Sequence, residues 1–211
     1  MMTTANKVTI ARIIMIPCFI TMAIYYGQSV SHGNPLPWQR WSAIAIFVLA
    51  AASDGIDGYI ARKFNQQSQL GEILDPLADK GLLLSGIITL SFSNWGYEFP
   101  VWFPVLVVAR DVVILSGTMT LHYLNGTVRV RPSWTGKTAT VMQMVAIALC
   151  MLQWNWFEKT LAIGPWSINL GSLDLAVGLA GLFTLVSGFG YLVNGIAQLH
   201  ATGHGDSKPR K

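Results

Sequence analysis

Four aspartates lie in a short polar stretch between two apolar segments of a 211-residue chain. This stretch, residues 53–80, holds five of the ten acidic residues in the whole sequence. Asp54 and Asp57 are spaced i, i+3, and Asp75 and Asp79 are spaced i, i+4, so each pair projects from one face of a helix. Four converging carboxylates repel one another, and bound cations or extensive protonation must relieve that repulsion. Carboxylate oxygens suit Mg²⁺, Mn²⁺ or Ca²⁺, and two such ions are a common device for phosphoryl chemistry.

The remaining residues of this stretch suit an anionic ligand. Gly58 and Ala61 keep one face of the first helix small, and Gly71 gives the same clearance on the second helix. Arg62 comes one turn after Gly58 and can hold a phosphate group bidentately. Structural alternatives stay open, because the glycines could serve helix packing and Asp75 could form an ordinary ion pair with Lys80 or Arg62.

The elements that must position these residues are membrane helices. The chain is 52% hydrophobic and 11% charged, whereas soluble domains carry about 25% charged residues. We expect an all-α integral membrane domain over residues 1–200, followed by a polar tail at 201–211. Six apolar runs approach the ~20 residues that cross a bilayer. They are roughly Val8–Tyr26, Gln39–Ile60, Leu70–Phe92, Val101–Leu124, Thr138–Trp154 and Gly171–Leu199.

The Lys and Arg residues divide unevenly when these runs are threaded across a bilayer. Only Arg40 and Lys159 would lie on one side, and eleven would lie on the other. The eleven are Lys7, Arg12, Arg62, Lys63, Lys80, Arg129, Arg131, Lys137, Lys208, Arg210 and Lys211. Both termini and the aspartates should therefore face the cytoplasm, in a multi-pass cell (inner) membrane. The net charge of +4 reflects this orientation and contact with anionic lipid, and it is no sign of nucleic-acid binding.

The acidic stretch resembles the signature of the CDP-alcohol phosphatidyltransferases. Eight defined positions over 26 residues fit that signature, including the gap between its halves. The pattern is Asp54-x-x-Asp57-Gly58-x-x-Ala61-Arg62, then eight residues, then Gly71-x-x-x-Asp75-x-x-x-Asp79. The six expected spans agree with the six-helix bundle of that family. The opening Asn6-x-x-Thr9-x-x-Arg12-x-x-x-x-Pro17 is similar to that of glycerophosphate-using members.

The resemblance implies that a hydroxyl attacks the β-phosphorus of a CDP-linked lipid and that CMP leaves. By the family pattern, Asp54, Asp57, Asp75 and Asp79 hold two divalent cations, Mg²⁺ or Mn²⁺, and Asp79 is also the general base. The CDP-binding residues would be Gly58, Ala61, Arg62, Gly71, Asn6 and Thr9. Asn6 and Thr9 could instead merely begin a helix. The role of Arg12 is left open.

The acceptor alcohol is expected to bind to a second group of cations. Arg110 lies in the middle of an apolar run, where a charge is a functional hypothesis by default. Arg110 and its neighbour Asp111 could form a structural contact, but neighbours on a helix face different ways, so we expect each to have its own partner. Arg131 and Lys137 could join Arg110 in a pocket for an acceptor phosphate, or could serve only topology and lipid headgroups.

The segment from Arg131 to Met144 resembles both phosphatidylglycerophosphate synthases and CMP-forming cardiolipin synthases. We expect CDP-diacylglycerol as donor and glycerol 3-phosphate as acceptor, giving phosphatidylglycerophosphate and CMP. Arg110-Asp111 departs from the Arg-Glu of many glycerophosphate-using members, so phosphatidylglycerol stays an alternative acceptor, as does an inositol phosphate. A divalent-cation transporter is a remote alternative. A homodimer is compatible with the family, but no residue here requires it.

Overall fold

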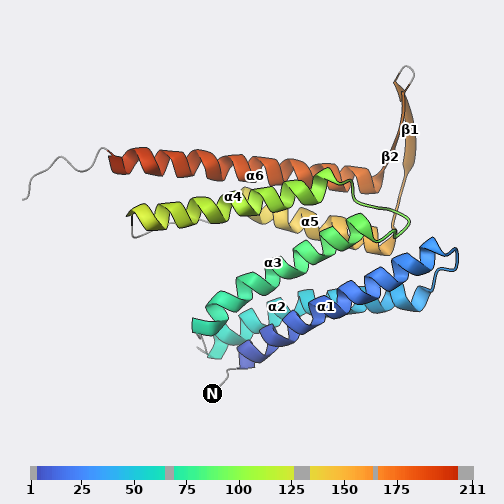
Figure 1. Ribbon diagram of the computed structural model, residues 1–211, viewed down its shortest axis with the longest axis horizontal. Coiled ribbons are helices and arrows are strands. Elements are labelled where there is room, and N and C mark those ends of the chain that lie inside the picture. Colours follow the sequence, from blue (N-terminus) through green and yellow to red (C-terminus); the bar gives the residue numbers. More distant parts are fainter. Residues whose placement is uncertain (1–3, 65–68, 126–133, 164–165, 204–211) are drawn as a thin grey trace, which may run out of the picture. The chain divides into compact units, whose positions relative to one another are not determined.

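The computed structural model describes the backbone of residues 4–64, 69–125, 134–163 and 166–203, and the side chains of residues 8–53, 78–119, 134–159 and 170–193. Figure 1 shows six helices and one β-hairpin along these segments. In chain order they are α1 (Thr4–Ser31), α2 (Pro37–Phe64), α3 (Gln69–Phe92), α4 (Trp102–Asn125), α5 (Trp134–Leu152), β1 (Glu158–Ile163), β2 (Trp166–Gly171) and α6 (Ser172–Gly203).

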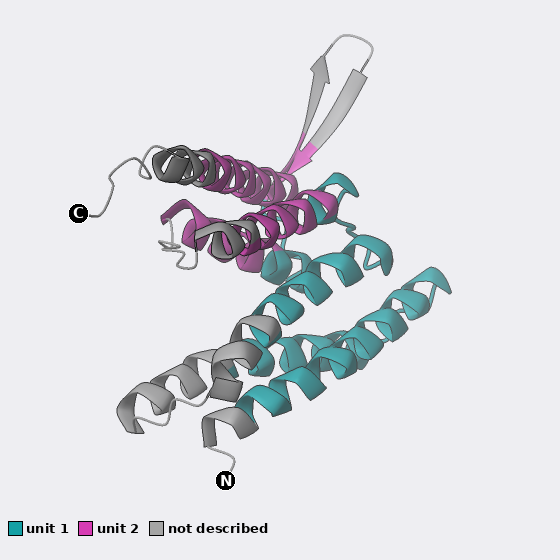
Figure 2. Cartoon of the chain, turned by 60° about the vertical axis from the view of Figure 1, so that its left-hand side comes forward, with its two compact units in different colours: residues 1–104, 147–156 teal, residues 105–146, 157–211 magenta. Residues whose placement is uncertain are grey.

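The helices belong to two compact units, which Figure 2 colours separately. Unit 1 comprises residues 1–104 and 147–156 and contains α1, α2, α3 and the end of α5. Unit 2 comprises residues 105–146 and 157–211 and contains most of α4, the start of α5, the hairpin and α6. Two long helices, α4 and α5, therefore run from one unit into the other.

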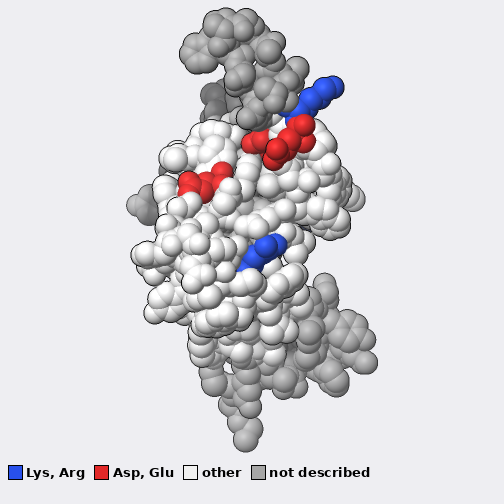
Figure 3. Space-filling view, turned by 90° about the vertical axis from the view of Figure 1, so that its right-hand side faces the viewer, with Lys and Arg blue, Asp and Glu red and all other residues white. Residues whose placement is uncertain are grey.

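Among the described residues, four helical segments are long and apolar enough to cross a membrane. They are Val8–Ser31, Trp102–Met119, Trp134–Leu152 and Ser172–Val193. Large apolar side chains also cover the outside of these helices, as Val105, Leu115 and Met119 do on α4 and Leu182, Leu185 and Phe189 do on α6. Figure 3 shows another side of the molecule, viewed along the helices, on which the Lys, Arg, Asp and Glu side chains are few and lie in small clusters. These features are those of a membrane protein, whereas the number of spans and the side on which the termini lie stay predictions.

The expectation of an all-α chain is wrong at one place. β1 and β2 form an antiparallel pair in which Glu158 is opposite Gly171 and Ile163 is opposite Trp166. The sequence signal was the Gly-Pro dipeptide at 164–165, which separates two short runs that contain Thr, Leu, Ile and Trp. The two strands, of six residues each, are much shorter than the apolar runs that identify the helices, so run length alone does not reveal them.

Unit 1 is built on a buried stripe of α1, which contacts both α2 and α3. Phe19 of this stripe packs against Phe47 of α2 with ring centroids 5.2 Å apart. Tyr26 meets Trp95, beyond the end of α3, edge to face at 4.7 Å, and the indole Nε1 of Trp95 donates a hydrogen bond to the Ala23 carbonyl at 3.0 Å. These contacts hold three helices of unit 1 around one aromatic core.

Glycine is required where α1 approaches the end of α3 most closely. A Cβ atom added at Gly27 would collide with the backbone carbonyl group of Ser93. A flexible side chain could move away from such a contact, but a backbone carbonyl cannot do so without shifting the whole segment. Gly27 therefore sets the distance between the two segments.

Arg40 joins the start of α2 to the end of α5. Its guanidinium donates to the Met151 carbonyl at 3.1 Å, to the Leu152 carbonyl at 2.5 Å and to the Gln153 side-chain oxygen at 2.9 Å. The last carbonyls of a helix have no partner inside the helix, so Arg40 caps the C-terminus of α5. Gln153 in turn donates from Nε2 to the Trp95 carbonyl at 2.6 Å. The last turn of α5 is thus a structural part of unit 1.

We predict that Gly27→Ala lowers the stability of the protein while Gly178→Ala, its matched control, does not. A Cβ at Gly178 would meet nothing within 4 Å, and alanine favours a helix by up to about 1 kcal/mol over glycine. The Gly27→Ala clash should outweigh that gain and cost about 1–3 kcal/mol. Thermal unfolding in detergent measures the difference. Equal unfolding midpoints for the two variants would contradict the close approach.

Candidate active site

The aspartate stretch lies on two neighbouring helices that run in opposite directions in Figure 1. Asp54 and Asp57 belong to α2, which continues to Phe64, and Asp75 and Asp79 belong to α3, which begins at Gln69. Both segments are helical, so residues spaced i, i+3 and i, i+4 share a helix face, as predicted. Asp79 is half-buried. The side chains of the other three aspartates lie outside the described ones.

The four aspartates can be compared by their distance along the helices from the ends of α2 and α3 that the link joins. Asp54 precedes the end of α2 by ten residues, and Asp79 follows the start of α3 by ten. At ~1.5 Å per residue both are about 15 Å from these helix ends. Asp57 and Asp75 are likewise both about 10 Å from them. Each aspartate of α2 thus has a counterpart on α3 at a similar distance along the helix.

Of the described side chains, no three His, Cys, Asp or Glu residues come together in a group that could hold a metal ion. Three of the four predicted ligands, Asp54, Asp57 and Asp75, are outside that set, so the metal site stays a prediction. The donor chemistry fits it: carboxylate oxygens are the ligands that Mg²⁺ and Mn²⁺ prefer.

The buried stripe of α1 becomes polar near the aspartates. Thr9 and Arg12 are both completely buried. The Arg12 Nε donates to the Ser53 Oγ at 3.1 Å, and that hydroxyl donates to the Ala50 carbonyl at 2.7 Å. Ser53 immediately precedes Asp54, so a buried guanidinium is hydrogen-bonded to the side chain of the residue before the first aspartate. We had not assigned Arg12 a role, although a charge in an apolar run was the signal.

The predicted CDP-binding residues are placed by element only. Gly58, Ala61 and Arg62 lie in the last two turns of α2, and Gly71 lies in the first turn of α3. Asn6 is in the first turn of α1. Their side chains are outside the described ones, and their roles stay predictions. Thr9 faces the interior of unit 1, as its complete burial requires.

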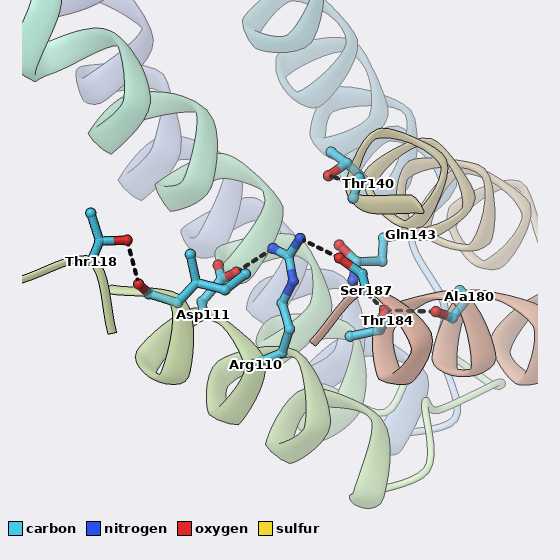
Figure 4. A network of polar contacts seen from close by, with 10 residues as sticks. Arg110, Asp111, Thr118, Thr140, Gln143, Ala180, Thr184 and Ser187 are labelled. Carbon is cyan, nitrogen blue, oxygen red and sulfur yellow. Dashed lines mark hydrogen bonds and ion pairs between the residues drawn. The ribbon is translucent and has the colours of Figure 1, made fainter. Parts of the chain in front are cut away.

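The guanidinium of Arg110, on α4, bonds to two side chains within unit 2, those of Asp111 and Ser187 (Figure 4). Its Nη1 forms an ion pair with the Asp111 Oδ1 at 2.6 Å, and its Nη2 donates to the Ser187 Oγ of α6 at 3.0 Å. The expectation of a separate partner for each of Arg110 and Asp111 is therefore wrong. Successive residues on a helix point about 100° apart, but the long arginine side chain bends back to its neighbour.

The guanidinium of Arg110 keeps a donor without a described partner. Its Nε is buried and forms no hydrogen bond with the described residues. The side chain is 15% exposed and that of Asp111 is 10% exposed. A buried, unpaired N–H costs about 1–3 kcal/mol, so this arrangement leaves capacity for an additional oxygen acceptor.

A second polar contact lies one turn from Ser187 on the same stripe of α6. Gln143 of α5 donates from Nε2 to the Thr184 Oγ1 at 2.8 Å, and that hydroxyl donates to the Ala180 carbonyl at 2.6 Å. Gln143, Thr184 and Ser187 are all buried, at 3% exposed or less. Sequence reasoning missed these residues. The available signal was an amide and two hydroxyls at positions where lipid-facing or core residues would be apolar.

The other predicted acceptor residues are not joined to Arg110 by any described contact. Lys137 is an exposed residue in the first turn of α5, and its Nζ lies 5.9 Å from the centroid of the Trp134 ring. Arg131 lies outside the described residues. Among the described residues, the support for the predicted phosphate pocket therefore comes from Arg110.

Comparisons with known proteins agree with the pattern of the acidic stretch. The family model for CDP-alcohol phosphatidyltransferase matches residues 2–186. The CDP-diacylglycerol–glycerol-3-phosphate 3-phosphatidyltransferase of Bacillus subtilis (strain 168) is 31% identical over 189 residues, which cover 88% of this chain and 91% of that protein. The protein of the same name from Escherichia coli (strain K12) is 33% identical over 153 residues, which cover 71% of this chain and 78% of that protein. The protein of that name from Blochmanniella floridana is 29% identical over 169 residues, which cover 79% of this chain and 78% of that protein.

The family match covers the helices that carry the acidic stretch, α4 with Arg110 and Asp111, α5 and about the first half of α6, and it ends just before Ser187. An eight-position signature, a membrane-protein surface and a match over most of the chain therefore agree, and the chain belongs to the CDP-alcohol phosphatidyltransferase family.

Proposed function

We propose that this enzyme transfers the phosphatidyl group of CDP-diacylglycerol to a hydroxyl of glycerol 3-phosphate, giving phosphatidylglycerophosphate and CMP. The observation that carries the choice of acceptor is the buried guanidinium of Arg110, which has a spare donor inside an apolar helix bundle. A neutral alcohol has no need of such a group, whereas a phosphate does. The names of the relatives support the same reaction.

The residues of α2 and α3 would hold the donor. Arg62 would bind a phosphate oxygen of CDP-diacylglycerol, while Gly58, Ala61 and Gly71 let the nucleotide approach the helix backbones, with Asn6 and Thr9 nearby on α1. Two Mg²⁺ or Mn²⁺ ions bound by the four aspartates would supply charge stabilisation on the pyrophosphate. The similar distances of Asp54 and Asp79, and of Asp57 and Asp75, from the linked ends of their helices support this grouping.

The transfer needs one proton acceptor and one leaving group. Asp79 would accept the proton from the attacking hydroxyl as its oxygen bonds to the β-phosphorus. The bond between that phosphorus and the oxygen of CMP breaks, and CMP leaves with the electron pair. No covalent enzyme intermediate is required. Arg110, with Arg131 and Lys137, would bind the acceptor phosphate and so orient its hydroxyl for in-line attack.

We further propose that the reaction takes place at the cytoplasmic face of a multi-pass cell (inner) membrane, with both termini in the cytoplasm, six spans and a possible homodimer. The uneven distribution of Lys and Arg supports this orientation. A second candidate is cardiolipin formation with phosphatidylglycerol as acceptor, favoured by the Arg110-Asp111 pair in place of the more common Arg-Glu.

The acceptor can be identified by measuring CMP release from CDP-diacylglycerol by the purified protein with Mg²⁺ or Mn²⁺. Glycerol 3-phosphate, phosphatidylglycerol, inositol 1-phosphate and serine are offered separately. We expect release with glycerol 3-phosphate, and none after the metal is removed with a chelator. Release with phosphatidylglycerol alone would assign the protein to the cardiolipin branch.

We expect Asp79→Asn to lower CMP release by about 10²-fold or more, because an amide cannot accept the proton and is a weaker metal ligand. Glu98→Gln makes the same chemical change at an exposed carboxylate and is the matched control. Mn²⁺ binding, followed by electron paramagnetic resonance, should weaken in the first variant only. Loss of CMP release together with retained cation flux into vesicles would instead favour the transporter alternative.

We expect Arg110→Ala to raise the KM for glycerol 3-phosphate about tenfold or more, since a charged hydrogen bond to the phosphate is lost. The KM for CDP-diacylglycerol should stay unchanged, which also shows that the protein is folded. Ser116→Ala, at an exposed position of the same helix, is the control. An unchanged KM for glycerol 3-phosphate in Arg110→Ala would refute the acceptor site.

A further inference from the structure

We propose that α6 selects the acceptor by orienting Arg110, and that Asp111, Ser187 and Tyr191 are positioning residues for this guanidinium. This inference rests on the proposed function, because it assumes that Arg110 binds the acceptor phosphate. None of the three residues belongs to the eight-position signature of the acidic stretch. We call Asp111, Ser187, Gly188 and Tyr191 the Arg110 cradle.

The cradle restrains the guanidinium on three sides. Asp111 holds Nη1 at 2.6 Å, and Ser187 accepts from Nη2 at 3.0 Å. The Tyr191 ring lies under the charged group, with its centroid 5.8 Å from Cζ, within the range of a cation–π contact. A long arginine side chain has many rotamers, and an anion site built on it is effective only when those rotamers are restricted before the ligand arrives.

Gly188 allows the stem of Arg110 to lie against the α6 backbone. A Cβ atom at this position would be 3.3 Å from the Arg110 Cγ and 3.7 Å from its Cβ. Two residues further along the same helix, a Cβ at Gly190 would meet nothing within 4 Å. Ser187, Gly188 and Tyr191 occur at i, i+1 and i+4, so they form one continuous patch of α6 around Arg110.

The hydrogen bonds of the cradle leave one edge of the guanidinium for a ligand. Arginine presents Nε and one Nη side by side as a planar fork that matches two oxygens of a phosphate. Asp111 occupies Nη1, whereas Nε has no partner among the described residues and Nη2 is shared with a single hydroxyl. The cradle therefore leaves N–H donors of the guanidinium for a ligand, and their geometry fits a phosphate monoester such as the phosphate group of glycerol 3-phosphate.

The alternative is a purely structural role, in which these contacts only hold α4 against α6. A structural role would change the unfolding temperature and would affect both substrates alike. A positioning role changes the KM for the acceptor alone, and its effect disappears when Arg110 itself is absent. These two readouts separate the alternatives.

The first experiment measures KM for glycerol 3-phosphate and for CDP-diacylglycerol in five single variants. Ser187→Ala should raise the KM for glycerol 3-phosphate about tenfold, and Tyr191→Leu should raise it severalfold, both without changing the KM for CDP-diacylglycerol. Tyr191→Phe keeps the ring and should behave like the parent protein. Gly188→Ala should raise the KM for glycerol 3-phosphate, whereas Gly190→Ala, its matched control, should not.

The second experiment repeats Ser187→Ala and Tyr191→Leu in the Arg110→Ala background, where neither should change the KM further. If Arg110→Ala raises the KM but the cradle variants do not, the inference is wrong and the proposed function stands. If Arg110→Ala itself has no effect, the acceptor site fails and the inference fails with it. Should Ser187→Ala not fold, the half-buried Tyr191 and the pair at Gly188 and Gly190 still decide the outcome.

Discussion

Charge inside an apolar helix bundle must be compensated where it lies, and this constraint determines the interior of both units. In unit 1 the guanidinium of Arg12 is completely buried and bonds to Ser53. In unit 2 the guanidinium of Arg110 is held by Asp111 and Ser187. These groups are largely removed from solvent, so hydroxyls of neighbouring helices and, for Arg110, the adjacent Asp111 carboxylate replace water as hydrogen-bond acceptors. The buried Ser53, Asp111 and Ser187 side chains are thus explained by the guanidinium groups whose hydrogen bonds they accept.

Both units place their polar contacts on the same stripe that forms the apolar core. On α6 the buried positions Val177 and Ala180 are followed by Thr184 and Ser187 at spacings of three and four. On α1 the buried aromatic positions follow Thr9 and Arg12. A single helix face thus holds apolar core residues along part of its length and hydrogen-bonding polar residues along the rest. Rigid packing beside a polar site limits the motion of the groups that must be oriented.

The helices and the acidic signature could be predicted from the sequence because both depend on local spacing. Apolar runs of membrane length and aspartates at helical intervals need no knowledge of tertiary contacts. The hairpin was missed because its signal, one Gly-Pro dipeptide, is short beside the apolar runs around it. The Arg110–Asp111 ion pair was misjudged because side-chain length can override the direction set by the backbone. Gln143, Thr184 and Ser187 could not be assigned, since their importance comes from the helices that they connect.

The capping of α5 by Arg40 has a consequence for how the protein is made. Arg40 and Trp95 belong to the first half of the chain, yet their partners at residues 151–153 follow two helices later. When α1, α2 and α3 have been synthesised, unit 1 is therefore still incomplete. The guanidinium of Arg40 and the carbonyl of Trp95 lack these partners until α5 has been synthesised. Folding of this unit consequently depends on a segment synthesised about sixty residues after α3 has ended.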